Sequence, residues 1–147
     1  MGQSRPLREP PIVPVFLDTN VIVYALDRSE PYKREIAVRL LDDPSADFVI
    51  SAQVLSEFYV VTTTKLDPPL SHDNARAALD HLCRLPVVAL DDRLVADATE
   101  VAREHQLSLW DAQIVQAAIR TGCEKVLTED LNHGQEIAGV GISNPFA

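Results

Sequence analysis

Short runs of Val, Ile and Leu alternate along the chain with longer segments in which apolar residues recur every three or four positions. The short runs are typical of buried strands, and the longer spacing is typical of amphipathic helices. Strands are predicted over residues 13–17, 47–51, 86–90, 125–128 and 140–143. Helices are predicted over residues 21–26, 32–41, 52–65, 71–83, 91–104 and 109–121. This alternation predicts an α/β fold built from βαβ units around a parallel sheet.

Capping residues stand at several of the predicted boundaries. Ser51 and Ser108 precede helices, where a hydroxyl accepts a hydrogen bond from a free backbone N–H. Gly122 ends the last helix, since glycine adopts a left-handed conformation without strain. The stretch "AGVGIS" predicts a turn before the last strand. One domain is expected over residues 13–147, preceded by a flexible, proline-rich arm over residues 1–12.

The composition is that of a soluble globular chain with one core. Of the 147 residues, 46% are apolar and 24% are charged, and no apolar run approaches the length of about 20 residues that a bilayer requires. The first 14 residues contain no apolar segment before a cleavage site, so no signal peptide is predicted. A cytoplasmic protein without membrane association is therefore expected.

The charge balance is acidic and argues against broad electrostatic adhesion to nucleic acid. There are 22 acidic and 13 basic side chains, giving a formal charge of −9. Basic residues concentrate only around the second predicted helix, at Arg28, Lys33, Arg34 and Arg39. A solvated helix face is the simpler interpretation of this concentration.

The soft metal ligands are scattered. Cys83 and Cys123 have no C-x-x-C partner, so they are predicted to be buried free thiols. No two of the four histidines are spaced as a helical zinc pair. A zinc site is therefore not predicted.

Four acids occupy positions that turns and surfaces do not explain. Asp18 and Asp130 each follow a predicted strand, at the carboxyl edge of the sheet where open α/β sheets bind ligands. Glu57 lies three residues after Val54 and four before Val61, so it projects from the apolar stripe of its helix.

Asp111 shares a helix face with apolar residues at positions 114, 115 and 118. Helix capping remains an alternative for Asp111, because carboxylates are favoured in a first turn. The same alternative applies to Asp18 and Asn20, which precede the helix predicted over residues 21–26.

Several carboxylates gathered against apolar neighbours repel one another and resist ionisation, and a cation removes both problems. Oxygen ligands without thiolate or imidazole favour Mg²⁺ or Mn²⁺ over zinc. Such an ion keeps open positions for a phosphodiester and converts a bound water into a nucleophile. One or two ions are compatible with this chemistry.

At this point the chain resembles a known family. The stretches "FLDTNVIVYAL", "ISAQVLSEF", "LWDAQIVQAA" and "VLTEDLNHG" occur in the order and on the elements typical of PIN-domain ribonucleases. The "WDA" and "TEDLNHG" forms and the tail "GVGISNPF" are most similar to VapC-type toxins of toxin-antitoxin pairs. The likeness spans residues 15–146.

The resemblance implies a three-layer αβα fold with about five parallel strands, and a Mg²⁺- or Mn²⁺-dependent endoribonuclease that cuts single-stranded RNA. It assigns the catalytic and metal-binding acids to Asp18, Glu57, Asp111 and Asp130. It assigns supporting positions to Thr19, Asn20 and Thr128, with Glu129 less certain. Adjacent residues of an extended chain face opposite ways, so Asp130 is preferred over Glu129.

The resemblance also implies partners and a biological role. Family members of this type restrain translation and growth, form homodimers, and are held inactive by a cognate antitoxin. An antitoxin Arg or Lys inserted among the carboxylates would block the site.

Two alternatives and one side chain stay open. The alternatives to an endoribonuclease are an aspartate-dependent phosphate-ester hydrolase with Asp18 as nucleophile, and a metal-binding interaction module without turnover. Trp110 beside Asp111 is predicted to pack in the core, with base stacking as the alternative.

Overall fold

A single sheet of six strands organises the protein, whose computed structural model describes residues 13–147. The strands are β1 (Val15–Leu17), β2 (Phe48–Ser51), β3 (Val87–Val88), β4 (Lys125–Leu127), β5 (Glu136–Ile137) and β6 (Val140–Ser143). Their order across the sheet is β3-β2-β1-β4-β6-β5, and every neighbouring pair is parallel except β5 with β6. The carboxyl ends of the central strands β1, β2 and β4 therefore meet at one edge.

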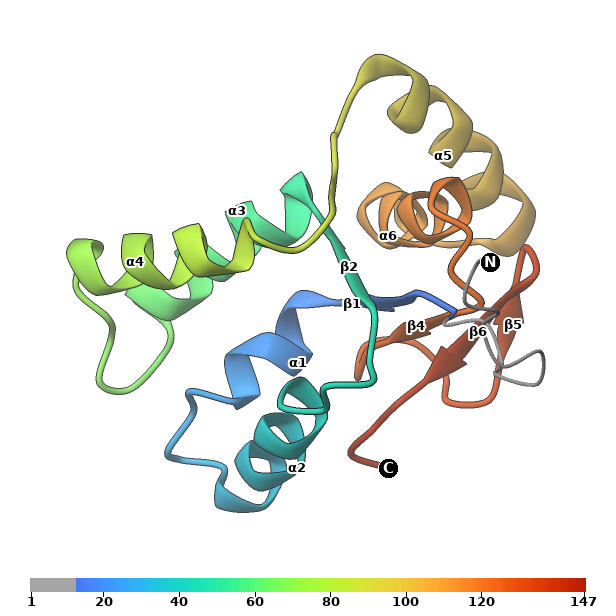
Figure 1. The fold of residues 1–147 in the computed structure, drawn as a ribbon. Coiled ribbons are helices and arrows are strands. Elements are labelled where there is room, and N and C mark those ends of the chain that lie inside the picture. Colours follow the sequence, from blue (N-terminus) through green and yellow to red (C-terminus); the bar gives the residue numbers. More distant parts are fainter. Residues whose placement is uncertain (1–12) are drawn as a thin grey trace, which may run out of the picture.

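Helices cover both faces of this sheet. They are α1 (Thr19–Tyr24), α2 (Pro31–Leu41), α3 (Ala52–Thr64), α4 (His72–Leu82), α5 (Asp92–His105) and α6 (Leu109–Arg120). Figure 1 shows α5 and α6 on one side of the strands, α1 and α2 on the other, and α3 with α4 projecting beyond the β2 side. This arrangement confirms the predicted three-layer αβα fold.

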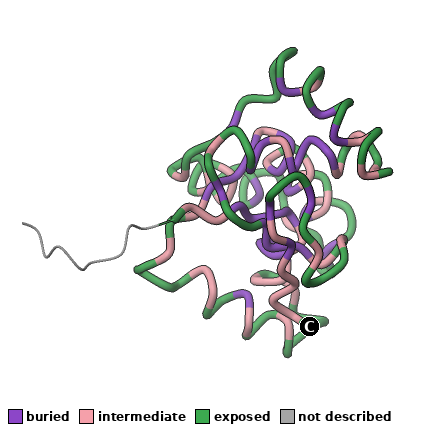
Figure 2. Tube along the Cα trace, turned by 90° about the vertical axis from the view of Figure 1, so that its right-hand side faces the viewer, coloured by how far each residue is buried: buried purple, intermediate pink, exposed green. Residues whose placement is uncertain are grey.

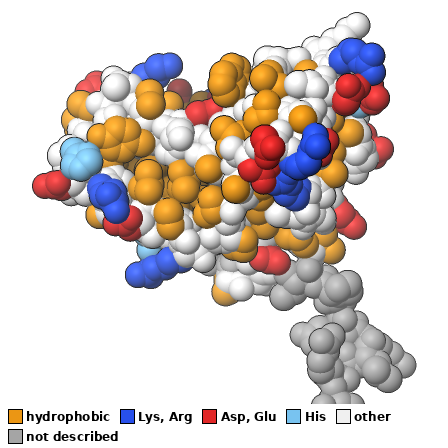
Figure 3. Space-filling model, turned by 90° about the horizontal axis from the view of Figure 1, so that it is seen from above, with side chains coloured by type: hydrophobic (Ala, Val, Ile, Leu, Met, Phe, Trp, Pro, Cys, Tyr) orange, Lys and Arg blue, Asp and Glu red, His pale blue; other side chains and the backbone are white. Residues whose placement is uncertain are grey.

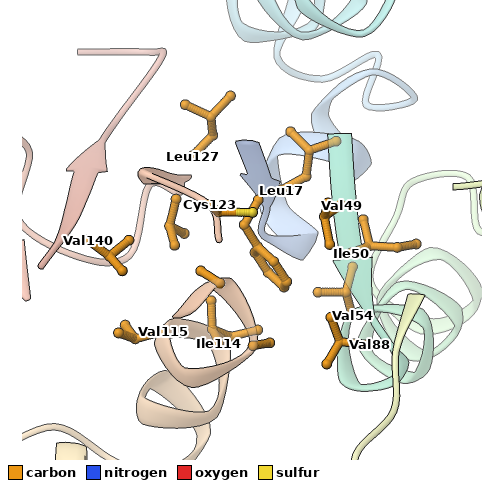
Figure 4. Close-up of a cluster of buried hydrophobic side chains, with 14 of the residues drawn as sticks. Leu17, Val49, Ile50, Val54, Val88, Ile114, Val115, Cys123, Leu127 and Val140 are labelled. Carbon is orange, nitrogen blue, oxygen red and sulfur yellow. The ribbon is translucent and has the colours of Figure 1, made fainter. Parts of the chain in front are cut away.

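Buried apolar side chains from the strands and from two helices form the core. Phe16, Leu17 and Ile50 of the central strands are fully buried, as are Val54 of α3 and Val115 of α6. Figure 4 shows side chains of β1, β2 and α6 converging in this cluster. Purple, buried segments accordingly concentrate in the middle of the tube in Figure 2.

The sixth strand was not predicted. The β5–β6 hairpin turns through Ala138 and Gly139, whose φ angles are both positive, at 51° and 84°. Two left-handed residues in a two-residue loop form the type of turn that matches the twist of a hairpin. The turn before the last strand is therefore confirmed, whereas a strand of two residues is too short to produce an alternating pattern.

Three further predictions are not confirmed as they stand. Helix α1 begins at Thr19, two residues earlier than predicted, because the Asp18 side chain caps it. Cys123 is buried as predicted, but Cys83 at the end of α4 is exposed, so that prediction is wrong. The predicted arm over residues 1–12 lies outside the described residues.

Among residues 13–147, every helix falls short of the length and apolar character needed to cross a bilayer.

Candidate active site

Asp18 lies between the end of β1 and the start of α1, at the carboxyl edge of the sheet. Its Oδ1 accepts a hydrogen bond of 2.7 Å from the backbone N–H of Thr19, and its Oδ2 accepts one of 2.7 Å from the Thr128 hydroxyl. The residue is only 6% exposed. Asp18 is thus a helix cap, and it is also a buried carboxylate held from two directions.

The surroundings of Asp18 disfavour its charge. Burial raises the pKa of Asp18 to about 6, and the nearby carboxylates of Asp130 and Glu57 add to the rise. The hydrogen bonds from Thr128 and Thr19 lower the pKa but do not offset the burial. A nearby cation would favour the ionised form.

Glu57 is half-buried on α3 and turns toward Asp18. Its Oε2 accepts a hydrogen bond of 3.0 Å from the Thr19 hydroxyl, and its Oε1 accepts one of 2.9 Å from Gln53 Nε2. Thr19 therefore connects the Asp18 and Glu57 carboxylates, donating its backbone N–H to one and its hydroxyl to the other.

Gln53 holds Glu57 in place, and the sequence interpretation missed it. Its amide nitrogen also donates to the carbonyl of Trp110 at 3.1 Å, and its amide oxygen accepts from Gln113 at 2.7 Å. Gln53 thus joins α3 to the first turn of α6. The available signal was its spacing, because Gln53 lies four residues before Glu57 on one helix face.

Asp111 lies in the first turn of α6. The cap of this helix is Ser108, whose hydroxyl oxygen accepts from the Asp111 backbone N–H at 3.1 Å. Burial raises the pKa of Asp111, Ser108 hydrogen bonding opposes this rise, and the Asp130 and Glu57 carboxylates add to it. Capping by Ser108 leaves Asp111 under the influence of the same two carboxylates that act on Asp18.

Asp130 follows β4 and is held through its backbone. Its N–H donates to the Thr128 hydroxyl oxygen at 3.0 Å, and the same oxygen accepts from Asn20 Nδ2 at 3.4 Å. Because the fully buried Thr128 also donates to Asp18, it links the ends of β1 and β4. The exposed Asp130 lines a hollow of about 300 Å³ together with Glu57, Thr19 and Asn20.

Glu129 turns away from this hollow. Its carboxylate accepts a hydrogen bond from the Tyr24 hydroxyl and pairs with Lys33 Nζ at 2.7 Å, while its backbone N–H donates to Asn20 Oδ1 at 3.2 Å. The structure therefore separates the two neighbouring acids, with Asp130 toward the hollow and Glu129 toward α2. Nothing in the sequence pairs Lys33 with a residue 96 positions away.

The prediction that Trp110 packs in the core is wrong. Trp110 is 62% exposed, although it stands beside Asp111 in the first turn of α6. Only its backbone carbonyl takes part in the network, through Gln53.

The donors present fit a hard divalent ion that keeps much of its water. Within residues 13–147, no three Asp, Glu, His or Cys side chains are grouped to hold a metal ion by themselves. Mg²⁺ typically uses one or two carboxylates and retains several waters, so it does not need such a group. Buried Asp18, with carboxylates around it and no cationic partner in the described hydrogen bonds, is the group that such an ion would satisfy.

The chain matches one known protein family. The family model described as "PIN domain" matches residues 15–136. No curated protein sequence matches the chain.

Several solved structures share the fold at low sequence identity. A toxin-antitoxin complex from Klebsiella pneumoniae is 17% identical with a TM-score of 0.66, covering 89% of this chain and 97% of that one. DNA-bound VapBC from Salmonella typhimurium is 21% identical with a TM-score of 0.63, covering 91% and 99%. VapC20 from Mycobacterium tuberculosis, described as a Sarcin-Ricin loop cleaving toxin, is 20% identical with a TM-score of 0.62, covering 79% and 91%.

These likenesses establish the fold, and the family match covers most of the described residues, from β1 to β5. The four predicted acids lie on the elements that the sequence assigned to them, between residues 15 and 136. The chain belongs to the PIN-domain family.

Proposed function

We propose that this protein is a metal-dependent endoribonuclease that cleaves single-stranded regions of RNA, and that it acts as the toxin of a toxin-antitoxin pair. The observation that carries the proposal is the convergence of acids from separate elements at one sheet edge. The Asp130 and Glu57 carboxylates raise the pKa of both Asp18 and Asp111, so Asp18 and Asp111 each lie near the same two acids. A metal and a phosphodiester are the ligands that such a site suits.

Asp18, Glu57, Asp111 and Asp130 are the residues that would hold Mg²⁺ or Mn²⁺, directly or through its waters. A bound divalent ion supplies charge for the scissile phosphate and lowers the pKa of a bound water. The chain's own contribution is orientation. Thr19 and Thr128 fix the two oxygens of Asp18, and Gln53 with Thr19 fixes those of Glu57.

Asn20 completes the support of the site. Its amide nitrogen donates to Thr128, and its amide oxygen accepts from the Glu129 backbone, so one side chain ties α1 to the segment after β4. A rigid support of this kind keeps the carboxylates in place against their mutual repulsion.

The toxin role and the partners rest on the similar structures and on charge. The similar structure from Klebsiella pneumoniae is described as a toxin-antitoxin complex, and that of VapC20 from Mycobacterium tuberculosis is described as a toxin. An antitoxin that places an Arg or Lys among four carboxylates would occupy the place of the metal and block phosphate. We propose such an antitoxin and a homodimeric assembly for this chain.

The deciding assay measures cleavage of labelled single-stranded RNA by purified, partner-free protein in Mg²⁺ or Mn²⁺. Cleavage is expected to disappear with EDTA and to fall at least 100-fold in Asp18→Asn. The matched control is Asp97→Asn, an equally conservative change at an exposed position of α5. Undiminished cleavage by Asp18→Asn would contradict the proposed site.

The same assay separates the two alternatives. Metal binding without RNA cleavage by the unaltered protein would identify a metal-binding interaction module. Phosphate trapped covalently on Asp18 would identify an aspartate-dependent phosphate-ester hydrolase.

A further inference from the structure

The acidic hollow does not end at the carboxylates. It extends along α1 and α3 to Lys65 and Leu66. A second hollow of about 340 Å³ shares Leu66 and is walled by Arg28, Arg34 and Asp67. A third, of about 680 Å³, shares Arg28 and Arg34. The three hollows therefore follow one another from the acids, past the end of α1, to the first turns of α2.

The cations along this path differ in their pairing. Lys33 is paired with Glu129, and Arg39 is paired with Glu35. Over residues 13–147, neither Arg28 nor Arg34 takes part in an ion pair or a side-chain hydrogen bond. The basic concentration seen in the sequence thus divides into cations neutralised by neighbours and two exposed arginines facing concave surface.

The walls of the second hollow carry two guanidinium groups against the single carboxylate of Asp67. The lining of this hollow is therefore net positive, whereas the whole chain has a formal charge of −9. An anionic ligand is therefore favoured here more than at an average place on the surface.

We infer that Arg28 and Arg34, with Lys65 on the way to them, form an arginine track that binds the phosphodiester backbone of the RNA strand leaving the acidic site. This inference rests on the proposed function. The six residues of α1 rise about 9 Å, which spans roughly two to three stacked nucleotides at 3.4 Å each. The track engages the phosphates of a strand that extends beyond the nucleotides at the carboxylates, and it carries no base selectivity.

An RNA backbone explains this surface better than a solvated helix face does. A strand approaching a protein of charge −9 is repelled, and metal at the carboxylates offsets the repulsion only there. Guanidinium groups placed a few nucleotides away hold the phosphates that the metal does not reach. Removing two phosphate contacts from a single strand lowers the dependence of log Kd on log salt by about 1.4.

The test compares the full-length protein with Arg28→Gln/Arg34→Gln. A fluorescein-labelled, unstructured 16-nucleotide RNA of mixed sequence is titrated in EDTA, which prevents cleavage, over a range of salt concentrations. The Gln variant is expected to bind at least fivefold more weakly at low salt, with the salt slope reduced by about 1.4. In Mg²⁺, its KM for the same RNA rises and its kcat stays within twofold.

Two further variants keep the result interpretable. Arg28→Lys/Arg34→Lys retains the charge and is expected to bind as the unaltered protein does. Arg84→Gln/Arg93→Gln removes the same charge from exposed positions on the α4 and α5 side and is expected to leave the affinity within twofold. All variants are expected to share the thermal midpoint of the parent, because the altered side chains are exposed.

If the parent cleaves RNA and the Gln variant keeps its affinity and salt slope, the arginine track is overturned while the proposed function stands. The two arginines would then be assigned to binding a protein partner. An equal loss in the Arg84→Gln/Arg93→Gln control would also overturn it, since net charge would then explain the effect. A parent protein that neither binds nor cleaves RNA would overturn the proposed function and the track together.

Discussion

At the scale of the residue, Asp18 combines two roles that oppose each other energetically. As a cap it helps to start α1, whereas as a buried acid with a pKa of about 6 it resists the charge that metal binding requires. Below pH 3.8 the Asp18 carboxyl is neutral in both the folded and the unfolded chain, so it does not destabilise the fold. This destabilisation grows as the pH rises from 3.8 through about 6, because the carboxyl ionises more easily in the unfolded chain.

Asp18→Asn should therefore stabilise the metal-free protein while abolishing cleavage. At pH 7.5 in EDTA the free energy of unfolding is expected to rise by on the order of 1 to 3 kcal/mol. Any weakening of the hydrogen bond from Thr128 would reduce this gain. The gain should shrink at pH 4.5. Urea unfolding of both proteins at the two pH values measures it, and a net loss of stability at pH 7.5 would contradict the buried, disfavoured charge.

The sequence revealed some of these residues and concealed others for physical reasons. The acids were visible because a carboxylate after a strand or within an apolar helix stripe conflicts with burial. The pairing of Lys33 with Glu129 and the bond from Gln53 to the Trp110 carbonyl were hidden because the partners are distant in sequence. Only the four-residue spacing between Gln53 and Glu57 was visible. Trp110 was misjudged because an aromatic residue in a helix gives no indication, by itself, of which face it occupies.

At the scale of the element, side-chain caps fix where the helices begin. Ser51, Ser71, Asp91 and Ser108 each accept a hydrogen bond from the backbone N–H three residues on, as the sequence indicated for Ser51 and Ser108. The starts of these four helices depend on such local chemistry and were predicted to within one residue, whereas the start of α1 was predicted two residues too late. The β5–β6 hairpin depends on pairing between two short segments, so the sequence did not indicate β5.

Ser108→Ala tests a cap that serves both the fold and the site. Loss of the hydroxyl leaves the Asp111 backbone N–H without its acceptor, and about 1 kcal/mol of stability is expected to be lost. Ser56→Ala is the control, because Ser56 is an exposed residue within α3 whose hydroxyl bonds only a carbonyl of its own helix. Equal effects of the two changes on urea unfolding would show that the Ser108 cap adds nothing.

The cluster of Tyr24, Lys33 and Glu129 ties α1, α2 and the segment after β4 together. Lys33 Nζ also lies 4.8 Å from the centre of the Tyr24 ring, whose edge-to-face partner is Phe146 near the C-terminus. This cluster fixes the residue next to Asp130 and so restrains the position of that carboxylate.

A double-mutant cycle on Lys33→Gln and Glu129→Gln measures this connection. The pair is about one quarter exposed on each side, so a coupling of roughly 0.5 to 1 kcal/mol in unfolding free energy is expected. Each single change should lower cleavage less than Asp130→Asn does, because the cluster positions the site without facing the hollow. Additive effects on stability would show that the two side chains do not interact in solution.

At the scale of the whole molecule, the proposed function requires an acidic chain to bind an acidic polymer. The charge of −9 favours an antitoxin with basic groups, while the proposed RNA binding uses the arginine track, with metal at the carboxylates adding to it during cleavage. Figure 3 shows apolar side chains spread over the face seen from above, with many of the charged side chains toward its left and right sides. An apolar surface of this kind is compatible with the proposed homodimer.

The homodimer is tested by sedimentation equilibrium of the purified chain. A mass twice that of one chain is expected, and it should persist at high salt if apolar contacts dominate the interface. A single-chain mass at micromolar concentration would remove the dimer from the proposal without affecting the site.

Binding of Mn²⁺ followed by electron paramagnetic resonance, which reports free and bound ion and so counts the bound ions directly, is the most decisive measurement. The unaltered protein is expected to bind one or two Mn²⁺ per chain, competed by Mg²⁺, while Asp18→Asn and Asp130→Asn lose most of this binding and Asp97→Asn retains it. Undiminished binding by both site variants would show that the converging acids are not a metal site.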